Sequence, residues 1–81
     1  MTLNEIRRIT NKVLVEEFEI EESTIKGNAN FRETLDLDSL DYVDLVVFVE
    51  ENFKTKLIHE DFVKIVTFND FYNLISSKID E

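Results

Sequence analysis

The sequence predicts an all-α fold, a small antiparallel four-helix bundle with three longer helices, one short helix and a long first loop. Three observations lead to it. Apolar residues recur at helical spacing in three segments, and helix-capping signals precede these segments. Hairpin signals are missing, because the chain has no Pro, one Gly and no Asn-Gly or Asp-Gly pair. With 81 residues and 43% hydrophobic content, residues 1–81 are expected to form a single domain.

The first helix is predicted over about residues 3–18. Thr2 and Glu5 fit a capping box, in which a hydroxyl acceptor is followed three residues later by Glu. Residues 19–37 lack periodicity, so they are predicted to form a loop that is held to the core by isolated apolar side chains. This loop is longer than is usual in a small domain, which hints at a function.

The second helix is predicted to begin after Asp38, which can serve as the N-cap, and to reach about Phe53. Asp41 then occupies the third helical position, and the lysines of residues 54–56 suit the C-terminal end. A short helix is predicted over about residues 59–64. A capping signal at residues 67–70 predicts the last helix, whose apolar stripe is Phe68, Phe71, Leu74, Ile75 and Ile79.

The helix predicted after Asp38 has two apolar faces. At 100° per residue, one stripe contains Tyr42, Leu45, Val46, Val49 and Phe53, and it suits a core. Nearly opposite lie Leu40, Val43 and Val47, among Asp44, Glu50 and Glu51. Either the rest of the chain covers both faces, or the outer stripe meets a partner. The surrounding carboxylates favour a partner, since buried carboxylates need their own cations.

The composition excludes several classes of function. A formal net charge of −9 argues against nucleic acid and anionic membranes as partners, and favours basic proteins. The chain has no Cys, which excludes disulfides and cysteine-ligated metals. No apolar run approaches the roughly 20 residues of a membrane span, and the N-terminus does not resemble a signal peptide. We therefore expect a cytoplasmic protein without membrane insertion.

Ser39 is the candidate functional residue. Its hydroxyl lies at a predicted helix start, where free N–H groups and the positive end of the helix dipole favour a phosphate-linked group. A serine without a general base is a poor enzyme nucleophile, and the chain has only one histidine, His59. No metal ligand set accompanies His59, so no metal site is predicted.

These features together resemble the acyl carrier protein family, over nearly the whole chain. The resemblance rests on residues 35–41 (Leu-Asp-Leu-Asp-Ser-Leu-Asp), the acidic helix that follows them, and the segments 57–61 and 64–68. It implies a four-helix fold and a free-standing carrier of the type II class. It also implies that Ser39 carries a covalent 4′-phosphopantetheine arm derived from coenzyme A, whose thiol holds acyl groups as thioesters in fatty acid or related biosynthesis.

The resemblance further implies a monomeric carrier without catalytic residues of its own. Its partners are then a phosphopantetheinyl transferase and acyl-processing enzymes with basic docking surfaces. The residues expected to contact them are Asp38, Leu40, Asp41, Asp44, Val47, Glu50 and Glu51. Two alternatives stay open: an aminoacyl or peptidyl carrier, and an acidic adaptor bundle that is never modified. An enzyme is the least favoured class.

One departure from the family pattern lies close to the candidate site. Family members commonly have Gly where this chain has Asp36. Because Gly alone adopts positive φ freely, the loop before Ser39 is expected to follow a different backbone path.

Overall fold

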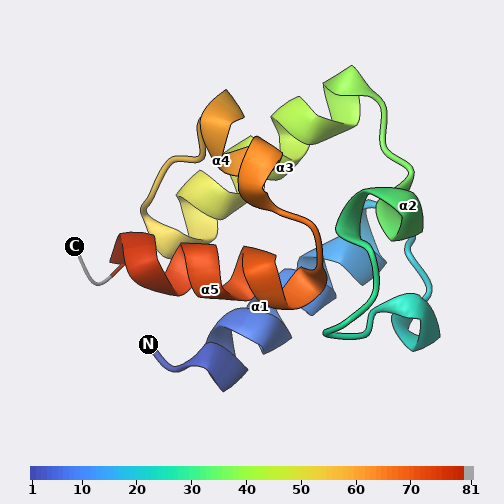
Figure 1. The fold of residues 1–81 in the computed structure, drawn as a ribbon, viewed down its shortest axis with the longest axis horizontal. Helices are drawn as coiled ribbons and strands as arrows, with labels where there is room; N and C mark the ends of the chain where they lie inside the picture. Colours follow the sequence, from blue (N-terminus) through green and yellow to red (C-terminus); the bar gives the residue numbers. More distant parts are fainter. Residues whose placement is uncertain (80–81) are drawn as a thin grey trace.

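The computed structural model describes residues 1–79. Its helices, in chain order, are α1 (Leu3–Glu17), the 3₁₀ helix η1 (Glu22–Thr24), α2 (Phe31–Leu35), α3 (Ser39–Phe53), α4 (His59–Lys64) and α5 (Phe68–Ile79) (Figure 1). The predicted starts and ends of α3 and α4 are confirmed, and α1 ends one residue earlier than predicted. Of the domain predicted over residues 1–81, the last two residues lie outside the described part.

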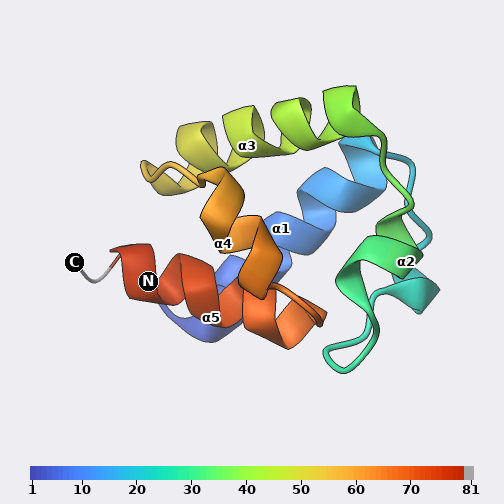
Figure 2. The same cartoon turned by 45° about the horizontal axis from the view of Figure 1, so that its top comes forward.

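The helical bundle predicted from the sequence is confirmed. Helix α1 runs opposite to both α3 and α5, and it contacts both of them (Figure 2). Helices α3 and α5 run in the same direction, because the segment containing α4 carries the chain back between them. The prediction of an unstructured loop over residues 19–37 is wrong in part, since this segment contains η1 and the five-residue helix α2.

Side-chain caps begin each of the three long helices, as the sequence predicts. At α1, the Glu5 N–H donates to the Thr2 hydroxyl over 3.2 Å, and the Glu5 carboxylate accepts from the Thr2 N–H over 3.0 Å. At α5, the Asp70 carboxylate accepts from the Thr67 N–H over 3.0 Å. These bonds satisfy N–H groups that have no partner inside the helix, which fixes where each helix begins.

The first loop is held against the start of α5 by backbone hydrogen bonds. The Phe31 N–H donates to the Val66 carbonyl over 2.9 Å, and the Asn69 N–H donates to the Gly27 carbonyl over 2.9 Å. Gly27 allows this close approach, because a Cβ atom at its position would lie 2.6 Å from the Asn69 side-chain oxygen. The loop therefore has a defined path toward Ser39.

Buried aromatic side chains join α2 and α5. Phe31 and Phe71 stack with ring centroids 4.9 Å apart, and Phe68 meets Phe31 edge-on at 5.1 Å. All three rings are at most 1% exposed. Phe48, which the apolar periodicity of α3 leaves unassigned, is half-buried and meets the Phe18 ring edge-on at 5.8 Å. Ring pairs of this kind stabilise a core beyond the area they bury.

An ion pair between the buried Asp61 and the partly exposed Lys78 connects α4 to α5. The Asp61 carboxylate lies 2.9 Å from the Lys78 ammonium and accepts a hydrogen bond from the Ile58 N–H over 2.9 Å. Burial raises the pKa of the Asp61 carboxyl, but the hydrogen bond from Ile58 and the charge of Lys78 together lower the pKa below its ordinary value.

We expect Asp61→Asn to lower the free energy of unfolding at pH 7 by about 1–2 kcal/mol, because a charge-assisted bond is lost. Since folding depresses the Asp61 pKa, the stabilisation is present above the unfolded pKa near 3.8 and is lost as pH falls through the lower folded value. The difference between variant and wild type should therefore shrink below pH 3.8. Urea midpoints at pH 7 and at acid pH measure it, and an unchanged difference at low pH would contradict the assignment.

Within residues 1–79, no helix combines the length and the apolar character that crossing a bilayer requires.

Candidate functional site

Ser39 is the first residue of α3, and the cap at this helix start exposes its side chain. The Asp41 N–H donates to the Asp38 carboxylate over 2.9 Å, and the Asp38 N–H donates to the Asp41 carboxylate over 3.4 Å. Ser39 takes no part in this capping box. Its side chain is exposed, and within residues 1–79 its hydroxyl makes no hydrogen bond. The hydroxyl is therefore open to a reagent from solvent without loss of the cap.

An open groove of about 520 Å³ lies beside Ser39, between the start of α3 and helices α2 and α4. Its lining consists of Arg32, Asp36, Leu37, Ser39, Tyr42, His59 and Phe62. The Tyr42 and Phe62 rings meet edge-on at 5.5 Å and form an aromatic wall. The Arg32 guanidinium donates to the Phe62 carbonyl over 2.9 Å, which joins α2 to α4 across the groove.

Asp36 retains the left-handed conformation that a glycine would adopt most easily. It ends α2 with φ 46° and ψ 47°, and its N–H donates to the Arg32 carbonyl over 2.8 Å. The different backbone path expected from the sequence is therefore not required, because Asp is among the few residues with side chains that tolerate this region. The strain of that conformation is located three residues before Ser39.

We expect Asp36→Gly to raise the free energy of unfolding by about 0.5–1 kcal/mol. Removing the Cβ relieves the left-handed strain, and this gain exceeds the extra chain entropy of glycine in the unfolded state. Glu33→Gly is the control. It also introduces a glycine, but inside α2, where glycine should lower the free energy of unfolding by about 1 kcal/mol. Urea unfolding of both variants measures these free energies. A destabilised Asp36→Gly protein would show that the strain argument is wrong.

The outer apolar stripe of α3 is exposed. The alternative in which the rest of the chain covers both faces of this helix is therefore not observed within residues 1–79. Leu40, Val43 and Val47 are 76%, 59% and 45% exposed. The opposite stripe supplies Leu45, Val49 and Phe53 to the core. Large apolar side chains in a row on a helix surface cost solvation free energy, and such patches commonly mark contact surfaces.

The acidic residues predicted to contact partners fall into two groups along α3. Asp38 and Asp41 flank Ser39, and Asp44 is exposed one turn farther along. Glu50 and Glu51 are exposed near the C-terminal end, where they line a shallow hollow together with Val47 and Lys54. Val47 lies about 12 Å from Ser39 along the axis, at 1.5 Å per residue. The structure therefore places all seven predicted contact residues on one helix and its cap.

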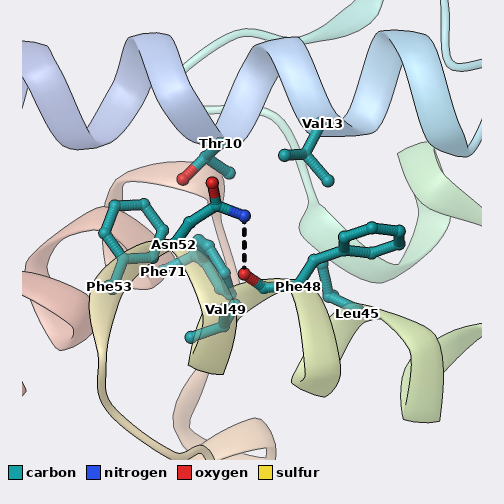
Figure 3. A pocket seen from close by; sticks show the side chains of 8 residues that line it. All are labelled: Thr10, Val13, Leu45, Phe48, Val49, Asn52, Phe53 and Phe71. Atoms are coloured by element: carbon teal, nitrogen blue, oxygen red, sulfur yellow. Dashed lines mark hydrogen bonds between the residues drawn. The ribbon is translucent and has the colours of Figure 1, made fainter.

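A small interior pocket of about 10 Å³ lies between α1, α3 and α5. Its lining is Thr10, Val13, Leu45, Phe48, Val49, Asn52, Phe53 and Phe71 (Figure 3). Side chains from α1 face those from α3 across it, and the Asn52 amide donates to the Phe48 carbonyl over 2.8 Å. The buried Thr10 hydroxyl has no hydrogen-bond partner among the described residues. The pocket has room for about one water molecule.

Sequence reasoning missed the contribution of Arg32 and His59 to the site. Arg32 lies in the segment predicted as loop, and His59 was predicted only to begin the short helix over residues 59–64, without a metal site. His59 is indeed the first residue of α4 and is exposed, but it also lines the groove beside Ser39. No local signal marks either residue, because tertiary contacts bring α2 and α4 to this place. Within residues 1–79, no cluster of possible metal ligands is present.

The residues present fit the expected phosphopantetheine arm. Ser39 offers an accessible oxygen for a phosphodiester, and an open groove of about 520 Å³ adjoins it. Its lining combines aromatic surface with an arginine and a histidine, two side chains whose N–H groups can donate hydrogen bonds to phosphate oxygens. A catalytic serine needs a base within hydrogen-bond reach, whereas a modified serine needs only access.

Comparisons with known proteins identify the family and the fold of this chain. Residues 7–75 match the family model described as a phosphopantetheine attachment site. Among solved structures, the chain is similar to the crystal structure of an acyl carrier protein from Thermotoga maritima, with a TM-score of 0.77 and 24% sequence identity. That similarity covers 96% of this chain and 91% of the other, and it shows the shared fold. The family resemblance predicted from the sequence is thus confirmed: the chain belongs to the phosphopantetheine attachment-site family, and it is a carrier protein rather than an enzyme.

Proposed function

We propose that Ser39 is the attachment residue and that the chain carries acyl intermediates as thioesters for fatty acid or related biosynthesis. The observation that supports this proposal best is the exposed Ser39 hydroxyl at the first position of α3, beside an open groove. The terminal thiol of the bound arm supplies the thioester chemistry, which a chain without cysteine cannot supply itself. A cytoplasmic location belongs to the same proposal.

The role of the chain in loading is to present the Ser39 oxygen. This oxygen forms a bond to the pantetheine-bearing phosphorus of coenzyme A, the pyrophosphate bond breaks, and adenosine 3′,5′-bisphosphate leaves. The proton of the hydroxyl must pass to a base of the transferase, since Ser39 has no basic partner within hydrogen-bond reach among the described residues. Asp38 and Asp41 keep the helix start rigid during this step, because each holds the backbone N–H of the other.

The proposed partners are a phosphopantetheinyl transferase and acyl-processing enzymes with basic surfaces. The outer face of α3 offers apolar side chains surrounded by carboxylates, which suits an apolar pocket with a cationic rim. The carboxylates accelerate encounter at long range, whereas Leu40 and Val47 add contact area once the surfaces meet.

The interior pocket between α1, α3 and α5 is too small to enclose an acyl chain. Its lining is largely apolar, but at about 10 Å³ it cannot hold more than the end of a chain. Deeper insertion requires α1 and α3 to separate, which breaks the contacts that Phe48 makes with Phe18. An acyl chain is therefore proposed to lie in the Ser39 groove.

Intact-mass measurement tests the proposal. Incubate the protein with coenzyme A, Mg²⁺ and a broad-specificity phosphopantetheinyl transferase; we expect the mass to increase by one arm. No increase in a folded sample would favour the unmodified adaptor. Loaded protein is then offered acyl groups by an acyl-transferring enzyme and aminoacyl groups by an adenylating enzyme, because acceptance of only the second would favour the peptidyl carrier.

A further inference from the structure

We propose that Arg32 and His59 bind the phosphodiester on Ser39 and thereby direct the arm into the groove between α2 and α4. This inference rests on the proposed function, because it assigns roles toward the arm that Ser39 carries. It begins from charge. A phosphodiester keeps a negative charge, and Ser39 lies among three carboxylates: Asp38, Asp41 and Asp36.

The helix end itself is poorly suited to hold this charge. A free helix N-terminus attracts phosphate through its N–H groups and its dipole. At α3, however, the Asp38 carboxylate already accepts the Asp41 N–H over 2.9 Å, and the Tyr42 N–H donates to the Asp38 carbonyl over 3.1 Å. A second anion at the same place is repelled by the first. The phosphate is therefore stabilised only where other cations face it.

The groove beside Ser39 contains two basic side chains that can take this role. Arg32 and His59 are its two basic lining residues, one from α2 and one from the first turn of α4. Arg32 is held in place, because its Nη2 donates to the Phe62 carbonyl over 2.9 Å. A guanidinium has five N–H donors, so this bond leaves others for phosphate. An imidazole donates one hydrogen bond even when neutral, so His59 contributes in either charge state.

The arrangement gives the arm a direction. With its phosphate on Arg32 and His59, the arm continues along the Tyr42–Phe62 wall rather than into solvent. Arg32 and His59 are thus positioning residues for the arm and take no part in bond making.

The test compares loaded with unloaded protein in matched variants. Prepare Arg32→Gln, His59→Gln, the double variant and the charge control Lys12→Gln, whose exposed side chain lies on α1 outside the groove. Confirm each loading by mass. The readout is the melting temperature of the loaded protein minus that of the unloaded protein, so that any loss of the Arg32–Phe62 bond cancels. We expect this difference to fall by about 2–4 °C in the double variant and to stay unchanged in the control.

Two spectroscopic readouts accompany the melting experiment. Since His59 is the only histidine, its ring gives one assignable NMR signal. In the wild type, loading should change the chemical shift of this His59 signal. The ³¹P chemical shift of the phosphodiester should differ between the loaded wild type and the loaded double variant. Arg32→Lys keeps the charge and should restore part of the difference. Equal melting differences in all variants, or a His59 signal that ignores loading, would overturn the inference. Absence of any mass gain in the wild type would instead overturn the proposed function.

Discussion

Ser39→Ala is expected to abolish the mass gain completely, while the protein remains folded. In the proposed loading reaction, the Ser39 hydroxyl oxygen forms the bond to phosphorus, and alanine provides no substitute for it. The remaining serines, Ser23, Ser76 and Ser77, lie outside the start of α3 and outside the groove. Intact mass after incubation with coenzyme A and transferase is the measurement. Ser23→Ala is the matched control and should gain one arm, as the wild type does.

The fold should not depend on the Ser39 hydroxyl, because that hydroxyl makes no hydrogen bond and the capping box lies in its neighbours. Ser39→Ala should change the free energy of unfolding by less than about 0.5 kcal/mol, since alanine is the better helix former. Asp38→Ala should cost about 1 kcal/mol, because it removes the N-cap acceptor. Urea midpoints distinguish the two. A modified Ser39→Ala protein would contradict the assignment of Ser39, and an unfolded Ser39→Ala protein would contradict the capping argument.

The long helices could be predicted because their signals are local. Each begins at a side-chain cap and then repeats apolar residues at helical spacing, so neither feature needs knowledge of distant contacts. The short α4 was also predicted, from the few residues around His59. Helical periodicity in the sequence predicted the outer stripe of α3 as a second apolar face. The structure was needed to show that nothing in residues 1–79 covers this stripe.

Helix α2 could not be predicted, because a single turn is too short to show periodicity. Its stability comes from far along the chain: Phe31 stacks on Phe71 at 4.9 Å, and the Phe31 N–H donates to the Val66 carbonyl. The left-handed Asp36 that ends α2 gives no sequence signal either, since glycine is the residue that usually marks this conformation. Both features depend on tertiary contacts.

The groove beside Ser39 could not be predicted either, because it also depends on tertiary contacts. Its two basic residues are separated from each other by 27 positions in the sequence, and they line one groove only because α2 and α4 lie side by side there, joined by the hydrogen bond from Arg32 to the Phe62 carbonyl. A solvent-exposed histidine without partners gives no indication of a function when only its neighbours in sequence are considered. Ser39 could be proposed as the attachment residue from the sequence, because a helix start is a local signal, whereas Arg32 and His59 could not be placed beside it.

Reversing the charges of Glu50 and Glu51 to Lys is expected to slow loading by the transferase about tenfold at low ionic strength. Both side chains are exposed beside Val47 on the outer face of α3, so they shape the electrostatic field that a basic partner meets first. Because salt screens such fields, the difference from wild type should shrink as ionic strength rises. Initial loading rates at several salt concentrations, with circular dichroism to confirm the fold, provide the measurement.

The matched control is the reversal of Glu16 and Glu17 to Lys, which changes the net charge equally at an exposed site on α1. If the position of the charge matters, this control should retain most of the wild-type rate. Val47→Ala should act differently: it removes apolar contact area, so it should weaken binding without changing the salt dependence. Equal slowing by both charge reversals would indicate that net charge alone sets the rate. An unchanged rate in the folded Glu50 and Glu51 variant would place the docking surface away from this end of α3.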